Sequence, residues 1–420
     1  MVQRTAVSIQ ESSARPTVQL HLPDGRVLEG QRGLPLGEFL AGVEGDYDPI
    51  VGGVVNGELR ELTYPIELES QVRPVTLAEA DGMRIYRRSL TFLLAGAFEA
   101  LFPRAELHVD HSVASGGYHC QVYGRPPLSR EELAQLQRRM QELVEQDLHF
   151  AKTQVKLEDA IEYFRSKGQQ DKVRLLAHRR KPHMIIYEMG GHRDYHHGYM
   201  VPSTGFLRWF ALTPAERGFT LQFPRRRRPT GLLQPPHYPK LLETFRQYGD
   251  WLNRLGIPNV GALNDSIEAG RIREVILVSE ALHEHRIGEI AAQIDQRRDT
   301  VRLILIAGPS ASGKTTFSKR LSIQLLALGL SPFPLEMDSF FVDREKTPRD
   351  ESGEYDYESL GALDVERLNR DLAGLIAGEQ VQLPRYDFRS GRQVQGPVVQ
   401  LSQEHIVILE GIHGLNPQLL

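Results

Sequence analysis

Short apolar runs in the first eighty positions alternate with polar residues and are separated by turn signals. Val18, Leu20 and Leu22 alternate with polar residues ahead of Pro23-Asp24-Gly25. This pattern predicts two strands joined by a turn, because alternation places every second side chain on one face of a sheet. A short helix is expected next, from about Pro35 to Ala41.

A hairpin signal follows that helix. The apolar runs Ile50–Val55 and Leu59–Leu62 flank Asn56-Gly57, a dipeptide typical of two-residue hairpin turns. Strand, turn, strand, helix and hairpin together predict a β-grasp domain over 16–78, preceded by a tail at 1–15.

Helical spacing then marks a second, α+β domain over 79–236. A helix is predicted from Arg130 to Leu148, with Ser129 and Glu132 forming a capping box at its start. Its buried stripe consists of Leu133, Leu136, Met140, Leu143 and Val144. Another helix should begin near Leu157, and strands are expected over Met184–Tyr187 and Leu207–Leu212.

The sequence of residues 237–298 predicts a helical linker. A 3.6-residue apolar stripe ends at Gly256-Ile257-Pro258. The stripe comprises Leu241, Leu242, Phe245, Tyr248, Trp251, Leu252 and Leu255. Two further helices are expected, over Ile267–Ile276 and Ser279–Arg297.

A phosphate-binding motif opens the last domain, 299–420. The buried-strand run Val301–Ala307 leads into Gly308-Pro309-Ser310-Ala311-Ser312-Gly313-Lys314-Thr315, and a helix continues to Leu328. Strand, glycine-bracketed loop and helix are the context that G-x-x-x-x-G-K-[ST] requires. The loop amides and the helix N-terminus favour phosphate. The residues predicted to bind ATP are Gly308, Ser310, Ala311, Ser312, Gly313, Lys314, Thr315 and Thr316.

Each ATP-site side chain has an expected task. Lys314 should reach the β- and γ-phosphates, and the Thr315 hydroxyl should hold Mg²⁺. Asp338, after the strand Phe333–Glu336, could accept the proton of an attacking hydroxyl or could instead cap a helix. Glu410, at the end of the buried run His405–Gly411, could hold Mg²⁺ through water or be a structural acid. No Asn-Lys-x-Asp motif follows, which argues against a switch GTPase.

Composition excludes several classes of protein. Of 420 residues, 40% are hydrophobic and 25% charged, and the net charge is −4, values typical of a globular protein rather than a disordered chain or coiled-coil rod. The apolar runs are too short to span a membrane, and no secretory leader is visible, so we expect a cytoplasmic protein with no membrane partner. A single cysteine, Cys120, excludes an intrachain disulfide and a thiolate zinc cluster.

Two polar features remain open. The run Arg225–Arg228 could be a solvated loop or a patch that contacts phosphates. Histidine neighbours occur at His108 and His111, around His196, and at His283 and His285. They lack a matching carboxylate or thiolate set at ligand spacing, so structural or solvated roles are expected.

The first domain resembles the TGS domain, a ubiquitin-like module. The carrying residues are Leu22-Pro23-Asp24-Gly25, Val54-Val55-Asn56-Gly57-Glu58-Leu59 and Leu62-Thr63-Tyr64-Pro65. The resemblance implies a binding module that contacts RNA or a regulatory ligand, without chemistry of its own.

The second domain is similar to the editing domain of threonyl-tRNA synthetases. The carrying residues are Arg87-Arg88-Ser89, Leu93-Leu94-Ala95, Gly116-Gly117-Tyr118, Arg125-Pro126-Pro127 and Val201-Pro202-Ser203-Thr204-Gly205. That family uses a His-x-x-x-His and a Cys-x-x-x-His pair, and the matching positions here hold Arg88, Phe92, His196 and Met200. We therefore expect neither editing chemistry nor a zinc ion.

The last domain resembles the uridine kinase and phosphoribulokinase family, which implies a parallel α/β sheet. The matching text is Gly308–Thr316, Asp338-Ser339-Phe340-Phe341, Tyr355-Asp356-Tyr357, Leu383-Pro384-Arg385-Tyr386-Asp387-Phe388 and Ile408-Leu409-Glu410-Gly411-Ile412. The resemblance implies that Asp338 is the general base, that Asp356 binds sugar hydroxyls, and that Tyr386 and Phe388 border the base.

Three departures from the family pattern stand out. Gly391 replaces the histidine that reads the pyrimidine, and Phe341 stands where a tyrosine is usual. The chain ends at Leu420, before the family's arginine-bearing lid, so we expect a kinase domain that is incomplete here, either because the chain is truncated or because the catalytic domain is defective.

The sequence therefore predicts an ATP- and Mg²⁺-dependent kinase of the uridine kinase type, with Asp338 and Lys314 as catalytic residues and a nucleoside or sugar as acceptor. One alternative is a phosphoribulokinase-like sugar-phosphate kinase, with Arg385, Arg389 and Arg392 near the acceptor. The other is an RNA- or ribosome-associated regulator that uses ATP binding as a switch.

Overall fold

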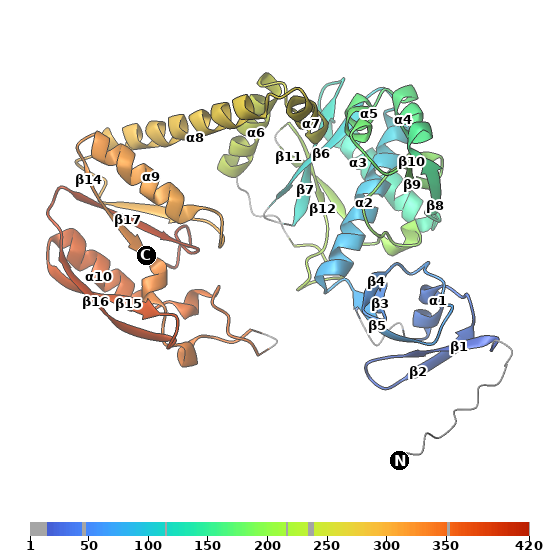
Figure 1. The fold of residues 1–420 in the computed structure, drawn as a ribbon, viewed down its shortest axis with the longest axis horizontal. Helices are drawn as coiled ribbons and strands as arrows, with labels where there is room; N and C mark the ends of the chain where they lie inside the picture. Colours follow the sequence, from blue (N-terminus) through green and yellow to red (C-terminus); the bar gives the residue numbers. More distant parts are fainter. Residues whose placement is uncertain are drawn as a thin grey trace, which may run out of the picture. The chain divides into compact units, whose positions relative to one another are not determined.

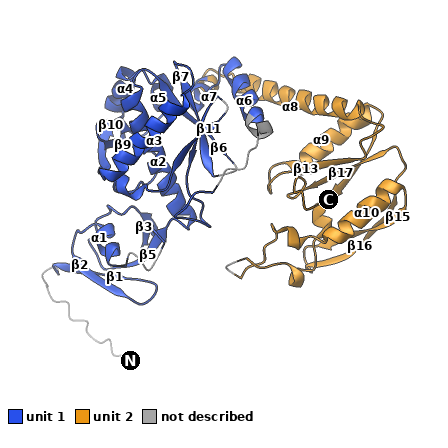
Figure 2. Cartoon of the chain, turned by 180° about the vertical axis from the view of Figure 1, so that it is seen from behind, with its two compact units in different colours: residues 1–265 blue, residues 266–420 orange. Residues whose placement is uncertain are grey.

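The chain forms two compact units, Met1–Asp265 and Ser266–Leu420 (Figure 2). The computed structural model describes residues 15–43, 48–113, 116–215, 217–233, 239–350 and 353–419. The predicted tail at 1–15 lies outside these residues except for Arg15. The division at 265 falls inside the segment 237–298 predicted as a helical linker. Among the described residues, no helix is long and apolar enough to cross a membrane.

A five-stranded sheet of order β2-β1-β5-β3-β4 begins the first unit (Figure 1). The strands are β1 (Thr17–His21), β2 (Val27–Gln31), β3 (Ile50–Val55), β4 (Glu58–Arg60) and β5 (Ser70–Thr76). β1 and β5 are parallel and the other pairs antiparallel. The predicted hairpin is present: Asn56 and Gly57 turn at φ values of 50° and 85°, which glycine and asparagine adopt most easily. The helix α1 (Leu36–Leu40) buries Leu36, Phe39 and Leu40.

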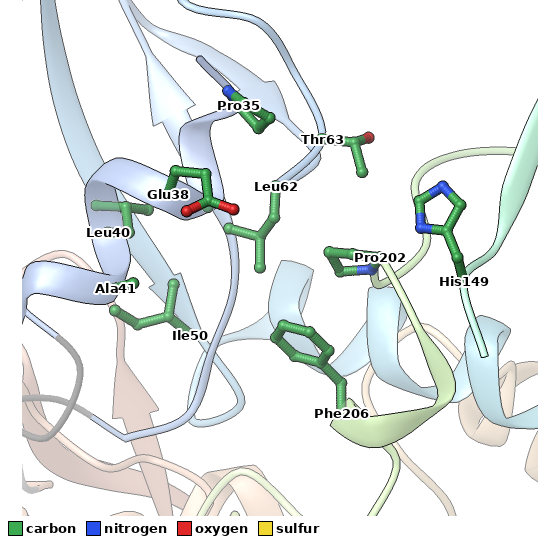
Figure 3. A pocket seen from close by; sticks show the side chains of 11 residues that line it. Pro35, Glu38, Leu40, Ala41, Ile50, Leu62, Thr63, His149, Pro202 and Phe206 are labelled. Carbon is green, nitrogen blue, oxygen red and sulfur yellow. The ribbon is translucent and has the colours of Figure 1, made fainter. Parts of the chain in front are cut away.

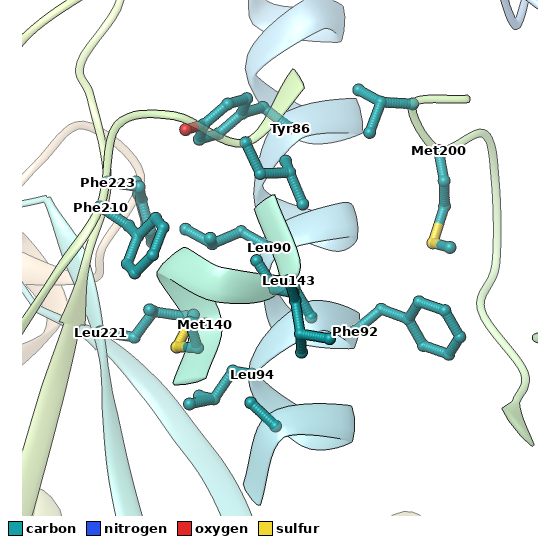
Figure 4. Close-up of a cluster of buried hydrophobic side chains, with 14 of the residues drawn as sticks. Tyr86, Leu90, Phe92, Leu94, Met140, Leu143, Met200, Phe210, Leu221 and Phe223 are labelled. Carbon is teal, nitrogen blue, oxygen red and sulfur yellow. The ribbon is translucent and has the colours of Figure 1, made fainter. Parts of the chain in front are cut away.

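The helix α2 (Ala80–Leu101) leads from this sheet into the rest of the unit. Its first turn lies so close to β5 that a Cβ on Gly82 would meet the Thr76 carbonyl oxygen at 1.9 Å. Val51 and Leu77 of the sheet region belong to the same buried cluster as Ile85 and Leu90 of α2. The cluster continues to Met140, Phe210 and Leu221 (Figure 4), so one edge of the first predicted domain joins the core of the second, while the rest of its apolar residues form a separate cluster.

Two more sheets complete the first unit. One has the order β11-β12-β7-β6 and the other the order β10-β9-β8. Their strands are β6 (Glu106–Val113), β7 (Gly117–Tyr123), β8 (Ala151–Lys156), β9 (His183–Met189), β10 (His192–Asp194), β11 (Ala211–Ala215) and β12 (Gly218–Gln222). The helices are α3 (Arg130–Glu145), α4 (Leu157–Ser166), α5 (Gln170–Ala177), α6 (Pro239–Arg254) and α7 (Val260–Glu268), the last running just past the boundary.

Two sequence predictions need correction. The expected strand Leu207–Leu212 is largely wrong, since a strand begins only at Ala211. Leu207 and Phe210 are buried core residues in an irregular segment, so their apolar pattern reflects burial rather than sheet pairing. The two helices expected over 267–297 are wrong as separate elements, because α8 (Ile272–Asp295) is continuous.

The second unit is built on a parallel sheet of order β13-β17-β14. Its strands are β13 (Leu303–Ala307), β14 (Ser331–Glu336) and β17 (His405–Gly411). Ile287 and Ala291 of α8 share a core with Leu321 and Leu325 of α9 (Lys314–Ala327). α10 (Val365–Ala377) packs near an antiparallel hairpin of β15 (Gln380–Asp387) and β16 (Arg392–Gln400).

Candidate functional site

The glycine-rich loop joins the end of β13 to the start of α9. Gly313, the residue before the helix, has φ 87°, and Ala311 has φ 59°. Gly308 has no space for a side chain, because a Cβ would lie 2.7 Å from Ser312 Oγ and 3.2 Å from Lys314 Cγ. The first amides of α9 have no partner within the helix, so the loop and helix end together provide N–H donors for phosphate oxygens.

Lys314 and Thr315 begin α9 and point to different partners. Lys314 Nζ donates a hydrogen bond to the Pro309 carbonyl oxygen at 3.1 Å, which keeps its charge beside the loop. Thr315 Oγ1 donates to Glu410 Oε1 at 2.6 Å. The two residues that the sequence assigns to Mg²⁺ therefore meet directly.

Glu410 is a buried carboxylate with one oxygen that accepts no hydrogen bond from the described residues. It is only 5% exposed, and its Oε2 atom is buried without a hydrogen-bond partner in the described structure. A buried carboxylate oxygen left unpaired is costly. Carboxylate and hydroxyl oxygens are ligands that Mg²⁺ accepts, often with waters retained, so this pair fits the expected cation.

Strand register brings Asp338 to the same edge of the sheet. Glu410 in the central strand β17 lies opposite Ile306 of β13 and Glu336 of β14, and Asp338 follows Glu336 by two residues. Partial burial raises the pKa of the Asp338 carboxyl, Lys314 opposes this rise, and Glu410 adds to it. The residue is nevertheless open to solvent at the sheet edge, so its carboxylate can be reached.

An aromatic group lies next to Asp338 along the chain. The Phe341 amide is 3.5 Å from the Asp338 carbonyl oxygen. The Phe341 ring lies 5.5 Å from Tyr386 and 6.2 Å from Tyr357, and Tyr386 lies 5.1 Å from Phe388. Tyr386 is buried, whereas Phe388 is 63% exposed. The two residues expected to border a base are thus together.

Asp356 and Arg392, the other two residues expected to bind the acceptor, have no described contact of their own with the aromatic group. Asp356 Oδ1 accepts a hydrogen bond from the Glu358 amide at 3.1 Å, which is a turn-forming role. Its neighbour Tyr357 belongs to the aromatic group. Arg392 is exposed on β16, opposite Asp387, and no described contact joins it to the aromatic group.

The sequence reasoning missed Arg344. Its side chain lies over Gly391, where an added Cβ would be 2.8 Å from the Arg344 Cζ and Nε atoms. Nothing in the spacing of residues 338–344 signals this contact, because it depends on how the β15–β16 hairpin folds back. The only available signal was the glycine itself.

The four editing-type positions lie within the first unit, mostly in its core. Phe92 and Met200 are buried, and the Phe92 ring lies 5.4 Å from the ring of His196. Arg88 donates a hydrogen bond to the Tyr199 carbonyl oxygen. Burial lowers the pKa of His196 to about 4, so the imidazole is neutral near pH 7.

Several pockets open among the described residues of the first unit. One, of about 360 Å³, is lined mainly by apolar residues of the sheet region and of the segment 202–206, together with Glu38, Thr63 and His149; Leu62, Pro202 and Phe206 face one another in it (Figure 3). Another, of about 400 Å³, is lined in part by His108, His111 and His119. No group of three or more potential metal ligands occurs in the ranges that the structure covers.

Comparison with known proteins assigns the second unit. A sequence model of the Phosphoribulokinase / Uridine kinase family matches residues 303–418. These residues form a kinase domain of that family. A solved structure titled as a possible uridine kinase from Bacillus stearothermophilus is 32% identical, with a TM-score of 0.28, over 32% of this chain and 73% of that one. The family is one of phosphotransferases that act on sugars or nucleosides.

The N-terminal half is similar to a different class of protein. Threonine–tRNA ligases of Burkholderia vietnamiensis and Paraburkholderia xenovorans are 33% and 32% identical over 197 residues. The match covers 46% of this chain and 31% of each ligase. The chain thus spans about a third of the length of these curated relatives.

Proposed function

We propose that the protein is an ATP- and Mg²⁺-dependent kinase that transfers the γ-phosphoryl group to a hydroxyl of a nucleoside or similar small molecule. The observation that supports it best is the meeting of Lys314, Thr315, Glu410 and Asp338 at one edge of the parallel sheet. Phosphoryl transfer needs a phosphate cradle, a cation and a base, and each has a candidate there.

Each residue has a distinct task in this proposal. The loop Gly308–Thr315 binds the triphosphate through its amides, and Lys314 exchanges the Pro309 carbonyl oxygen for the β- and γ-phosphates. Thr315 and Glu410 would hold Mg²⁺, which neutralises charge on the phosphates. Asp338 takes the proton of the acceptor hydroxyl as that oxygen attacks, and ADP leaves.

The acceptor would lie along the aromatic group. The exposed Phe388 offers a ring face to a base or sugar and the buried Tyr386 backs it, while Asp356 and Arg392 are proposed to contact its polar groups. Asp356 would have to contact the acceptor while it also accepts the hydrogen bond from the Glu358 amide. That the acceptor is a nucleoside is part of this proposal. Gly391 carries no side chain with which to recognise a base, so other residues would have to do so.

Replacing the proposed base tests this function. Asp338→Asn keeps the shape of the side chain but removes the proton acceptor, so acceptor-dependent ADP formation should fall by about 10² to 10⁴-fold. ATP-analogue affinity, measured by calorimetry, should stay within a few-fold. Glu404→Gln, a carboxylate-to-amide change at an exposed position, is the control. Near-normal transfer by the Asp338 variant would refute the assigned role.

For the N-terminal half we propose a β-grasp, TGS-like domain over 16–78 and an editing-like domain over 79–236 without hydrolytic activity. The sheet order β2-β1-β5-β3-β4 with one covering helix supports the first. Phe92 and Met200 in the core support the second, because neither side chain can activate water. A cytoplasmic location is proposed with them.

A second candidate function is RNA binding by the first unit, with ATP as a switch. The similarity to tRNA ligases and the exposed run Arg225–Arg228 favour it. Filter binding of tRNA at two salt concentrations tests it, since phosphate contacts give an affinity that falls steeply with salt. Turnover that no acceptor stimulates would favour this candidate over the kinase.

A further inference from the structure

The pocket of about 400 Å³ in the first unit is lined mainly by residues of the strands β6 and β7 and of the helix α6. On β7 its lining residues are His119, Gln121 and Tyr123, which lie two positions apart and so share one face of the sheet. Cys120, which points to the opposite face, belongs to the apolar core. The pocket therefore lies on the polar face of this sheet, and none of the four editing-type positions lines it.

Two imidazoles in this pocket have a buried nitrogen atom without a hydrogen-bond partner among the described residues. The atoms are His111 Nε2 and His119 Nδ1, and His119 is only 5% exposed. Burial lowers the pKa of both histidines, although Asp110 opposes this. Both rings are therefore neutral near pH 7, and a neutral imidazole has one nitrogen that accepts a hydrogen bond. Leaving such an atom buried and unpaired is costly, and a ligand in the pocket would remove that cost.

Aromatic rings line the same pocket. The Phe245 ring stacks on the His111 ring, with centroids 4.3 Å apart and an interplanar angle of 20°. The Tyr123 ring lies 4.5 Å from the His108 ring. Phe245, Tyr123 and Tyr248 are 42%, 41% and 55% exposed, so these rings offer π faces to a ligand. Such faces attract cations.

The pocket also has more acidic than basic side chains. Its charged residues are Asp110, Asp171, Glu243, Asp250, Arg217 and Arg246. Glu243 and Asp250 both accept hydrogen bonds from Arg246, whereas the groups that act on the Asp110 carboxyl are histidines and Gln121. The excess of carboxylates disfavours an anion, and no group of three or more metal ligands occurs among the residues that the structure describes. A cation that donates hydrogen bonds fits this lining best.

We propose that this pocket binds a small organic ammonium ion, with Asp110 as its counter-ion and with His111 and His119 as hydrogen-bond acceptors. An ammonium group has three donors and no acceptor, which matches a carboxylate and two unpaired imidazole nitrogens. The exposed rings of Tyr123 and Phe245 would contact the carbon atoms that carry the ammonium group. The site lies in the first unit, so its ligand is a molecule other than ATP and the phosphoryl acceptor.

Binding calorimetry with the full chain near pH 7 tests the proposal. The probes are two amines, cadaverine and phenethylamine, and two alcohols of matched shape, pentanediol and phenethyl alcohol. At least one amine should bind about tenfold or more tightly than its matched alcohol, because only the amine makes charge-assisted hydrogen bonds. Asp110→Asn should weaken that amine by about 10- to 100-fold. Asp299→Asn, at an exposed position of the second unit, is the matched control and should leave the affinity unchanged.

A second variant fills the pocket without changing its charges. A Cβ on Gly249 of α6, which also lines the pocket, would meet no atom within 4 Å, and leucine favours a helix more than glycine does. Gly249→Leu should therefore keep the thermal midpoint of the protein while it weakens binding of the amine.

Three results would overturn the proposal. The first is that neither amine binds more tightly than its matched alcohol. The second is that Asp110→Asn affects the amine no more than Asp299→Asn does, or that Gly249→Leu leaves the amine affinity unchanged. The third is that Zn²⁺, tested alone, binds to the wild type but not to Asp110→Asn, since this pocket would then be a metal centre.

Discussion

At the scale of single residues, burial decides which charges a site can hold. Glu410 keeps a buried oxygen unpaired at the proposed cation site, whereas Phe92 and Met200 fill the editing-type positions with apolar groups. We propose that the first marks a retained cation site and the second a lost hydrolytic site. The sequence alone supports both proposals, because each follows from the residue type at a motif position.

His196 provides a prediction about pH. Its pKa is lowered to about 4 by burial, from 6.5 in a model peptide, so between these values the unfolded chain binds the extra proton and the folded chain does not. The free energy of unfolding should therefore fall as pH drops from 7 to 5, by about 1–2 kcal/mol from this residue.

His196→Leu should show a smaller loss over the same interval. The measurement is the thermal midpoint of wild type and variant at pH 7 and pH 5. The hydrogen bond from His192 is the chief cause that lowers the pKa of Glu99 to about 2. Glu99 therefore loses its contribution to the free energy of unfolding only below about pH 4.5, and it does not affect the change between pH 7 and pH 5. Parallel pH dependence in the two proteins would show that His196 is not the titrating group.

At the scale of elements, periodicity predicted the strands and helices that have one buried face. α3 begins at Arg130 as expected, and β13 with α9 encloses the phosphate loop as the motif requires. α2 was missed because twelve of its 22 residues are buried, which leaves no clear polar face. Arg344 could not be found either, since its position depends on the fold of a hairpin about fifty residues away.

The N-terminus of α3 offers a prediction about helix capping. The Ser129 side chain accepts the Glu132 amide at 3.2 Å, and Glu132 Oε2 accepts the Ser129 amide at 2.9 Å. Ser129→Ala should cost about 1 kcal/mol of stability and lower the midpoint of the first unit by about 2–4 °C. Ser129→Asp, which can also cap, should lose much less. Equal losses in the two variants would mean that another contact holds this helix end.

At the scale of the whole molecule, two units with separate cores should melt in separable steps. An ATP analogue with Mg²⁺ should stabilise only residues 266–420. At a hundred times its Kd, it should raise their free energy of unfolding by about 2.7 kcal/mol and so raise the temperature of their transition alone. Differential scanning calorimetry measures the shift.

Lys314→Met should abolish most of that stabilisation, because it removes the charge beside the phosphate loop. Lys319→Met, at an exposed position of the same helix, should retain it. A shift of both transitions, or an unchanged shift in the Lys314 variant, would contradict the assignment of the nucleotide site.

The core shared by the first sheet and α2 limits how this chain can be divided. Val51 is 1% exposed and Leu77 is fully buried, and a Cβ on Gly52 would meet Ile85 of α2 at 3.0 Å. A fragment that ends at the sequence boundary near residue 78 would bring this apolar face into contact with water, which promotes self-association. The proposed TGS-like domain is therefore expected to lose stability when residues 16–78 are transferred to another protein without α2. A fragment designed to fold on its own should therefore extend beyond residue 78 and include the first turns of α2.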